Sequence, residues 1–251
     1  MDALIKILEK FDKKRNELVS QGKWNEDAVA ECFEPCARGI LCNGYFLVNG
    51  EYIIDLGAIE LYYHEEEEGG IKDYIMYHTN AHSSKSKVYK LNNNSFPYFK
   101  FGSFNLHQSG IDVTFENEEK KYRASFLIRS YRVLKTEDGL YPENDDTKYD
   151  THSTHIFDDM FYSGYGNTEI VWIPTDKKNR KLELDDPIER TNVAYYEKPD
   201  IKDNKIYGSN DIITENDYNL DNKKYIKIKD KFYKRDMRKW QFKLKGIEEE
   251  K

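Results

Sequence analysis

The chain has 251 residues, enough to bury a full hydrophobic core, and no Pro/Gly/Ser-rich linker divides it. Its formal net charge of −7 argues against a protein that coats nucleic acid by global attraction, although a local basic face could still bind DNA. The 20 tyrosines are part of a 14% aromatic fraction, which favours strands and stacking surfaces, so we expect a mostly β chain.

The cysteines and the apolar runs bear on the cellular compartment. Cys32, Cys36 and Cys42 are an odd number without a secretory leader, which argues against a disulfide framework. Asp2 and Glu9 interrupt the first apolar residues, unlike a signal-peptide core, and no run approaches the ~18 apolar residues of a membrane span. We therefore expect a cytoplasmic protein with reduced cysteines and no membrane partner.

The first elements are helical by their spacing. Apolar residues recur every three or four positions in residues 2–21, which predicts an amphipathic helix. Its Leu4, Leu8 and Phe11 should pack against the outside of a sheet. Asn25 then resembles the N-cap of a second helix.

A change of period follows the second helix. Pro35 is expected to end that helix, so residues 1–36 are predicted to be a helical extension. Residues 37–251 would then form a β-rich domain, and the two parts would make one structural unit.

Strand patterns begin soon after Ala37. We expect strands at Gly39–Val48, Glu51–Ile54 and Ala58–Tyr63, with Asn49-Gly50 as the turn between the first two.

The clearest hairpin lies further along the chain. Ile111–Phe115 alternates apolar and polar residues, and the polar turn Asn117–Lys121 leads to the aromatic-rich strand Tyr122–Tyr131. Glu169–Ile173 and Asn192–Tyr196 are shorter predicted strands. We expect Gly39–Tyr63 and residues 102–131 to pair in one antiparallel sheet.

One strand carries a candidate catalytic pair. In Ala58–Tyr63, alternation places Glu60 and Tyr62 on the same face, where a carboxylate beside a phenol could activate a water as general base. The alternative is an exposed acidic residue on an outer face. Arg129 follows the apolar run Phe126–Ile128, so we expect its guanidinium to be buried and to need a charged partner.

Two further groups of residues have the composition of binding sites. The segment Tyr225–Lys245 interleaves lysine and arginine with aromatic residues, which is typical of a phosphate-binding surface or of a strand pair with a lysine-rich solvent face. Its nucleic-acid-binding candidates are Lys234, Arg235, Arg238, Lys239 and Lys243.

His152 and His155 lie one helical turn apart with Asp158 and Asp159 close behind, a spacing that could ligate zinc. No third ligand at a fixed spacing supports that site, and helix capping is the alternative role of these polar residues.

Several short motifs occur in order between residues 37 and 246. They are Ala37–Leu41, Gly57–Tyr62, Ala81–Ser83, Gly102–Phe104, Ser109–Gly110, Phe126–Arg129 and Arg238–Gly246. In this order they resemble the alkyladenine (3-methyladenine) DNA glycosylase family. The resemblance implies one α+β, mostly antiparallel β domain, with a curved or barrel-like sheet flanked by N-terminal helices.

The resemblance also implies roles for individual residues. Glu60 would activate the water that displaces the base, and Arg129 would hold a phosphate or that water. Tyr62 and His82 would line the pocket for a base flipped out of the duplex, because the glycosidic bond is otherwise inaccessible. The expected protein is a monomeric DNA N-glycosylase that excises damaged purines and uses no metal or other cofactor.

Some positions depart from the family pattern. Ser109 stands where the family inserts an aromatic wedge, Leu106 or His107 replaces a pocket aromatic, and Glu116 or Asn117 stands near a base-discriminating asparagine. We retain His107, Ser109 and Glu116 as substrate-binding candidates. Loss of the wedge weakens base flipping, and an added carboxylate repels the phosphodiester backbone. The alternative function is therefore a catalytically silent binding module that keeps the fold.

Overall fold

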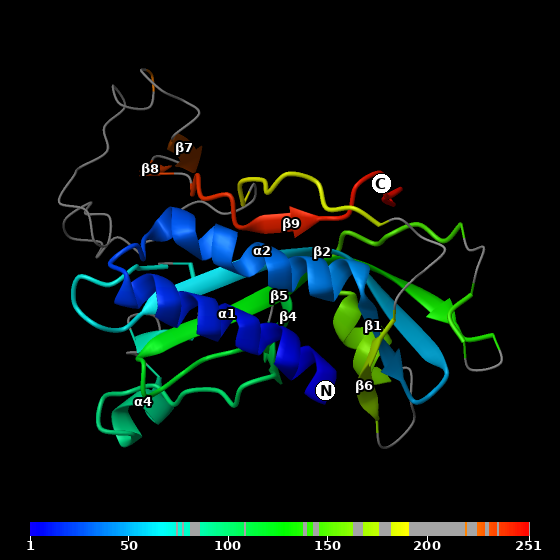
Figure 1. Ribbon diagram of the computed structural model, residues 1–251, viewed down its shortest axis with the longest axis horizontal. Helices are drawn as coiled ribbons and strands as arrows, with labels where there is room; N and C mark the ends of the chain where they lie inside the picture. Colours follow the sequence, from blue (N-terminus) through cyan, green and yellow to red (C-terminus); the bar gives the residue numbers. More distant parts are fainter. Residues whose placement is uncertain are drawn as a thin grey trace.

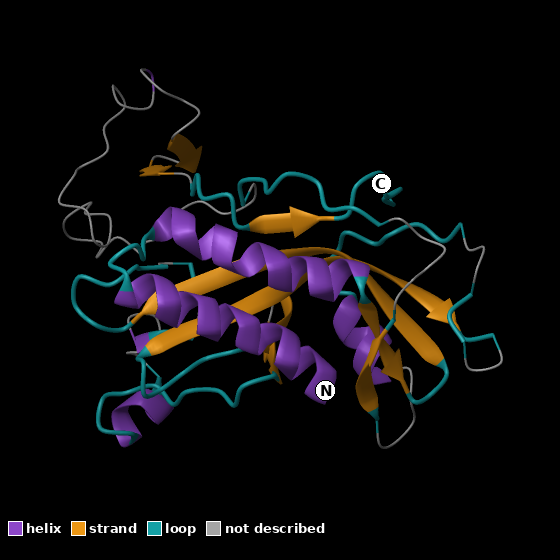
Figure 2. Ribbon diagram, in the orientation of Figure 1, coloured by secondary structure: helices purple, strands orange, loops and turns teal. Residues whose placement is uncertain are grey.

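A computed structural model of the chain describes residues 1–73, 75–76, 78–80, 86–107, 109–137, 140–142, 146–162, 168–175, 182–190, 219, 225–228, 231–234 and 236–250. Those residues form an α+β fold in which two N-terminal helices cover a curled antiparallel half-barrel sheet (Figure 1 and Figure 2). The predicted fold class is confirmed.

The main sheet has seven strands in the described part of the chain. Its strands are β1 (Gly44–Val48), β2 (Tyr52–Glu65), β3 (Ser103–His107), β4 (Gly110–Thr114), β5 (Tyr122–Lys135), β6 (Ile170–Pro174) and β9 (Gln241–Lys243). Their order is β3-β4-β5-β2-β1-β6, and β9 pairs with β2 beyond the end of β1. The predicted antiparallel pairing is confirmed, as is the strand at β6. A separate hairpin joins β7 (Tyr225–Ile228) to β8 (Lys231–Lys234), whereas the predicted strand Asn192–Tyr196 lies outside the described residues.

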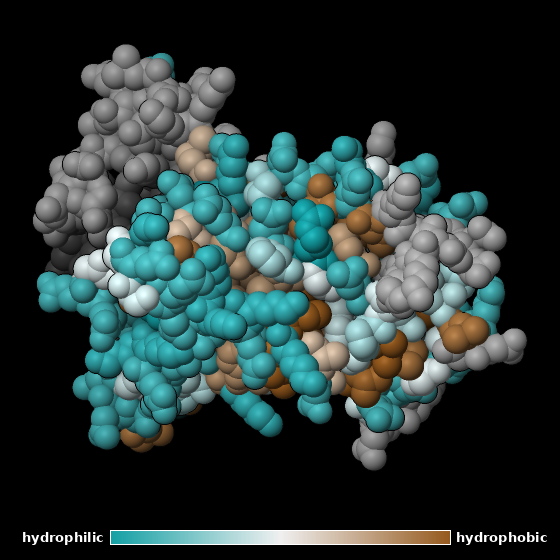
Figure 3. Space-filling model, viewed as in Figure 1, coloured by the Kyte–Doolittle hydropathy of each residue, from teal (hydrophilic) through white to brown (hydrophobic). Residues whose placement is uncertain are grey.

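Two long helices lie side by side across one face of the sheet (Figure 1). They are α1 (Asp2–Ser20) and α2 (Glu26–Cys42), and two shorter turns are α4 (Lys87–Leu91) and the π-helical η1 (Asp158–Tyr162). The predicted contacts of α1 are confirmed, because Leu4, Leu8 and Phe11 are fully buried. Much of the outer surface over α1 is hydrophilic, as expected for an amphipathic helix (Figure 3).

The second helix begins as predicted but ends later. The side chain of Asn25 accepts a hydrogen bond from the amide of Ala28 and caps α2. Pro35 does not end the helix, which continues to Cys42 through the expected boundary at residue 36. Pro35 is exposed, so water can reach the backbone carbonyl that it leaves unpaired one turn earlier, at Glu31. Burial of the apolar residues of α2 that follow Pro35 outweighs the ~3 kcal/mol cost of a proline inside a helix.

The strand boundaries near this helix also differ from the prediction. Residues 39–42 are helical, so β1 starts at Gly44. The predicted turn is confirmed, because Asn49 and Gly50 both have positive φ angles, 53° and 70°. The two strands expected after it are one continuous 14-residue strand, β2.

The pairing of β2 with β5 is irregular at one point. The register passes from Leu56↔Tyr131 to Ala58↔Ser130 and then to Ile59↔Ile128, which leaves Gly57 and Arg129 outside the ladder. A Cβ on Gly57 would lie 2.4 Å from the ring of Tyr149, so this close approach requires glycine. Such bulges re-aim neighbouring side chains, here that of Arg129.

Alternation gives the sheet two different faces. The face under the helices is apolar and includes Ile59, Leu61, Phe126 and Ile128, all of which are fully buried in the main core. Cys32 and Cys36 of α2 join this core, and their thiols donate to backbone carbonyls of α1 at 3.4 and 3.1 Å. The opposite face carries polar side chains that are also buried. They include Glu60, His64, Asp112, Thr114, Arg123 and Ser125.

No helix in the described ranges is long and apolar enough to cross a membrane.

The packing of α1 can be tested at Phe11. Its ring contacts Phe33 and Phe115 with centroid distances of 6.1 and 5.2 Å. Phe11→Ala should lower the free energy of unfolding by about 3–5 kcal/mol, because it removes a large buried side chain and leaves a cavity. Chemical denaturation measures this change. The exposed neighbour Lys10 provides a control, since Lys10→Ala should change stability by less than about 0.5 kcal/mol. Equal effects of the two substitutions would contradict the packing.

Candidate functional site

A row of side chains crosses four strands on the polar face of the sheet. Glu60 of β2 is in register with Leu127 of β5 and with Gln241 of β9, and Leu127 is in register with Asp112 of β4. Side chains in register on neighbouring strands point to the same face, so Asp112, Glu60 and Gln241 share it.

The row contains buried acceptors without donors. Glu60 Oε2, Asp112 Oδ1 and Gln241 Oε1 have no hydrogen bond among the described residues. Buried polar atoms nearly always have a partner, so a cluster of unsatisfied acceptors marks a place where a donor is expected. Water or the N–H and O–H groups of a substrate would satisfy them. These three residues define what we call the acceptor row.

Two neighbours hold the Glu60 carboxylate, which is itself fully buried. The hydroxyl of Tyr62 donates to Glu60 Oε1 at 2.6 Å. Arg129 Nε lies 3.4 Å from Oε2, which is an ion pair but not a hydrogen bond. One carboxylate oxygen is therefore fixed by a donor, while the other keeps a free lone pair beside a positive charge.

The Tyr62 hydroxyl stays protonated in this position. Burial, and after it the adjacent Glu60 carboxylate, holds the pKa of Tyr62 well above its ordinary value of 10. The guanidinium of Arg190 lies 5.0 Å from the centre of the Tyr62 ring. Tyr62 is thus a reliable donor that orients Glu60, and Arg190 fixes its ring.

Arg190 belongs to a buried ion-pair network at the edge of β2. It bonds Asp73 at 3.0 Å and also contacts Asp236, which pairs with Arg238 at 2.7 Å. Burial opposes ionisation of Asp73, but Arg190 and then Arg238 outweigh it and lower its pKa to about 2. Arg190 also donates to the carbonyl of Leu61, so the network fixes β2 next to Glu60.

The sequence-predicted catalytic residues come together. Glu60, Tyr62 and Arg129 meet as expected, and the alternative of an exposed Glu60 is wrong. Arg129 has the predicted charged partner, yet its side chain is 20% exposed rather than buried. The bulge explains this, because it moves Arg129 out of the regular ladder. His82 lies outside the described residues.

Of the substrate-binding candidates, His107 and Ser109 lie beside the acceptor row. His107 Nε2 is 3.1 Å from Asp112 Oδ2, and the amide of Ser109 donates to His107 Nδ1 at 3.2 Å. An accepting Nδ1 places the proton of a neutral imidazole on Nε2, which faces the carboxylate. The turn between β3 and β4 therefore orients Asp112.

Glu116 has a different environment. Its carboxylate contacts Arg123 at 3.2 Å and His78 Nε2 at 2.9 Å, and it accepts the amide of Phe99 at 2.8 Å. Arg123 also contacts Glu66, whose pKa falls to about 2 because hydrogen bonds from His64, Asn80 and Arg123 outweigh its burial. The described contacts of Glu116 are therefore those of a structural carboxylate.

The basic candidates do not form one described surface. Arg238 lies inside the ion-pair network, which corrects its assignment to an exposed basic face. Lys243 pairs with Glu249 at 2.7 Å, and Lys239 is exposed. Arg235 and the side chain of Lys234 lie outside the described residues.

Several residues at the site were missed by sequence reasoning. Asp112 alternates with apolar neighbours and could have been placed on the polar face, but its pairing with His107 needs the β3–β4 turn. Gln241 lies inside the Arg238–Gly246 motif but was not recognised as a site residue, because β9 pairs with a strand 181 residues earlier (241 − 60 = 181). Arg190 could not be recognised either, since its partner Asp73 lies 117 residues away.

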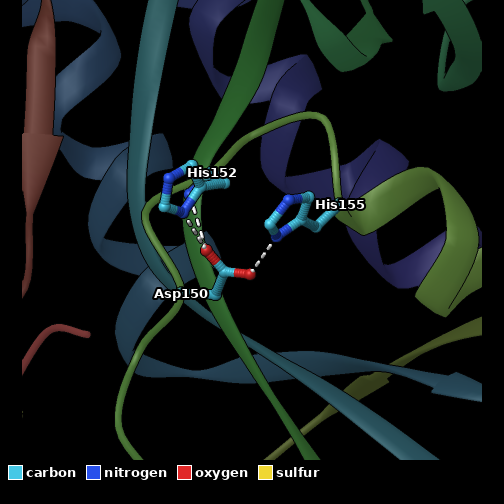
Figure 4. A group of neighbouring side chains, drawn as sticks. All are labelled: Asp150, His152 and His155. Carbon is cyan, nitrogen blue, oxygen red and sulfur yellow. Dashed lines mark hydrogen bonds and ion pairs between the residues drawn. The ribbon is translucent and has the colours of Figure 1, made fainter. Parts of the chain in front are cut away.

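One group of described residues could hold a metal ion. It consists of Asp150, His152 and His155, whose ligand atoms lie within 4.8 Å of one another (Figure 4). The predicted pair of histidines is therefore joined by Asp150 instead of Asp158 or Asp159. Asp159 accepts the hydroxyl of Tyr131 at 2.6 Å. The aspartate two residues before His152 was the missing sequence signal.

Comparisons with known proteins give no relative: no family model, curated protein or solved structure matches the chain.

The ion-pair network predicts a pH-dependent effect of Asp73→Asn. The folded-state pKa of Asp73 is lowered from 3.8 to about 2, so its contribution to stability is complete above about pH 4 and is lost as the pH falls toward 2. The variant should lose about 3–5 kcal/mol of unfolding free energy at pH 7, because the buried Arg190 and its neighbour Arg238 are then left to share the single carboxylate of Asp236. The difference from wild type should shrink below pH 4.

Denaturant titrations between pH 7 and pH 2.5 measure this effect. Asp186→Asn is the matched control, since Asp186 is exposed, and it should cost less than about 0.5 kcal/mol at every pH. A loss for Asp73→Asn that stays constant down to pH 2.5 would argue against the ion pairs.

Proposed function

We propose that this protein is a metal-independent DNA N-glycosylase in which Glu60 is the general base. The observation that carries the proposal is the state of the Glu60 carboxylate. It is fully buried, Oε1 accepts a 2.6 Å hydrogen bond from Tyr62, and Oε2 has no donor among the described residues. An oriented carboxylate with one free, dehydrated oxygen is suited to take a proton from water.

The neighbouring residues support the same chemistry. Asp112 Oδ1 and Gln241 Oε1 are further acceptors on this face, so a water or substrate donor near Glu60 would find several partners. Arg129 places a positive charge beside Glu60 Oε2 and, because its side chain is 20% exposed, can also face a substrate. A phosphate of a nucleotide is a natural ligand for such a guanidinium.

The proposed reaction is hydrolysis of the bond between a purine and deoxyribose. Glu60 removes a proton from water, the water oxygen bonds to the anomeric carbon, and the glycosidic electron pair leaves with the base, which is then protonated. The substrate class rests on the resemblance of Gly57–Tyr62 and Phe126–Arg129 to the glycosylase motifs. The base must first be extruded from the duplex to reach Glu60.

A second candidate is a binding module without catalysis, favoured by specific contacts. Arg238 and Glu116, both candidates for nucleic-acid or base contacts, are held in buried ion pairs. Ser109 offers a small polar side chain where an aromatic wedge would insert. The missing wedge weakens base flipping, and the ion pairs leave Arg238 and Glu116 less available to a nucleic acid, without altering Glu60.

Glu60→Gln tests the catalytic proposal. The amide is nearly isosteric and keeps an acceptor for Tyr62, but it cannot take a proton. Release of free base from a duplex with one alkylated or deaminated purine should fall by ~10²- to 10⁴-fold, the usual effect of losing acid-base catalysis. Thermal unfolding checks that the variant is folded.

The control is Glu119→Gln, which makes the same change at an exposed turn residue and should leave the rate unaltered. A wild-type protein that releases no base from any of several lesions would rule out the glycosylase in favour of the binding module. A Glu60→Gln variant with full activity would instead contradict the role of Glu60 as general base.

DNA binding gives an independent test of the nucleic-acid assignment. Contacts between cationic side chains and phosphates release counterions, so affinity should fall steeply between 50 and 200 mM salt, by roughly 10-fold or more for a few contacts. Fluorescence anisotropy with a labelled duplex measures this dependence. Absence of binding at the lowest salt would exclude DNA as the partner of either candidate function.

A further inference from the structure

We propose that Asp150, His152 and His155 form a binding site for a divalent transition metal of the zinc class. The three side chains converge at the surface between β5 and η1 (Figure 4). His155 Nδ1 lies 2.8 Å from Asp150 Oδ2, and His152 Nδ1 lies 3.1 Å from Asp150 Oδ1. The two imidazole rings are stacked, with centroids 4.8 Å apart.

The spacing of the ligand atoms is close to that of a metal site. Zinc binds nitrogen and oxygen at about 2.0–2.2 Å in a tetrahedral arrangement, so its ligand atoms lie about 3.4 Å apart. The ligand atoms here lie within 4.8 Å of one another. Both histidines are more than half exposed, so small rotations of their side chains close the remaining gap.

The backbone that carries these ligands is held in place. Asp150 forms a β-bridge with Tyr131, with hydrogen bonds of 3.0 and 2.7 Å in the two directions. The amide of His152 donates to Asp150 Oδ1 at 2.6 Å, and the amide of His155 donates to the carbonyl of His152 at 3.0 Å. Because these hydrogen bonds already fix the turn, metal binding would cost less conformational entropy.

The turn is also anchored beyond the ligands. Ile156, next to His155, is fully buried in the main core, and the Ser153 hydroxyl donates to the carbonyl of Ser109 at 2.8 Å. Gly110 packs so closely that a Cβ there would lie 2.4 Å from the Ser153 carbonyl oxygen. A bound metal would therefore lie on a segment that already contacts both β5 and the turn between β3 and β4.

The donor set selects the class of metal. Two imidazoles and one carboxylate suit zinc and its neighbours in the first transition series, whereas magnesium and calcium prefer oxygen ligands. Asp150 presents both carboxylate oxygens to the imidazoles, Oδ1 to His152 and Oδ2 to His155. Three protein ligands leave a coordination position for water.

Other residues that bind zinc are poor competitors in the described structure. Cys32 and Cys36 are buried, and burial raises the pKa of each thiol to about 12, so neither supplies a thiolate at neutral pH. Asp159 is bonded to Tyr131, which leaves Asp158 as the exposed carboxylate nearest in sequence. Asp150 and Asp158 thus provide a matched comparison.

The experiment is a titration of the full chain with zinc chloride by isothermal calorimetry, with cobalt(II) absorption as a second readout. We expect one equivalent to bind, and the cobalt complex to show the spectrum of nitrogen and oxygen coordination without thiolate charge transfer. Asp150→Asn, His152→Ala and His155→Ala should each weaken binding by more than the ~10- to 100-fold typical of losing an outer-sphere partner.

Asp158→Asn should bind zinc as wild type does. His152, His155 and Asp158 are exposed and the Asp150 side chain is 21% exposed, and circular dichroism verifies that each variant is folded. Absence of binding at millimolar zinc would overturn the proposal, as would binding that survives all three ligand substitutions or that depends equally on Asp158. The titration requires no catalytic activity, so its outcome is independent of the role of Glu60.

Discussion

The pairing of β2 with β5 is the interaction on which the rest of the structure depends. Both strands have 14 residues and they pair along their full lengths, so they form the boundary between an apolar face and a polar face. The helices α1 and α2 bury the apolar face, while Glu60 and its neighbours occupy the polar one. A shift of this register by one residue would exchange the faces and bury Glu60 under the helices.

The polar face is stable because its buried charges are matched. Three buried arginines of the described residues have carboxylate partners away from the helices: Arg123 with Glu116, Arg132 with Asp55 at 3.0 Å, and Arg190 with Asp73. Buried pairs add little net stability, since desolvation offsets their attraction, but removing one partner is costly. The acceptor row differs from these pairs, because three acceptor oxygens without a hydrogen-bond donor, Glu60 Oε2, Asp112 Oδ1 and Gln241 Oε1, lie there on neighbouring strands.

The sequence predicts local features of this chain well and long-range contacts poorly. Alternation placed Glu60 beside Tyr62, and the Asn49-Gly50 turn and Asn25 cap follow from short-range chemistry. Pro35 led to a wrong helix end. Its face of the helix is exposed, which makes the missing hydrogen bond tolerable, and the local sequence pattern does not determine that exposure. Arg190 and Gln241 lie more than 100 residues from Asp73 and Glu60, respectively, and no periodicity links such positions.

Two thiols in the interface between α1 and α2 allow the rate of helix separation to be measured. Cys32 and Cys36 lie between α2 and α1, hydrogen-bonded to the carbonyls of Phe11 and Ile7. An electrophile cannot reach them while the helices are docked, and their protonated state makes them unreactive there. Their rate of alkylation therefore reports how often α1 separates from α2, with no label added to the chain. The two cysteines are therefore built-in probes of local opening, which can be distinguished from global unfolding.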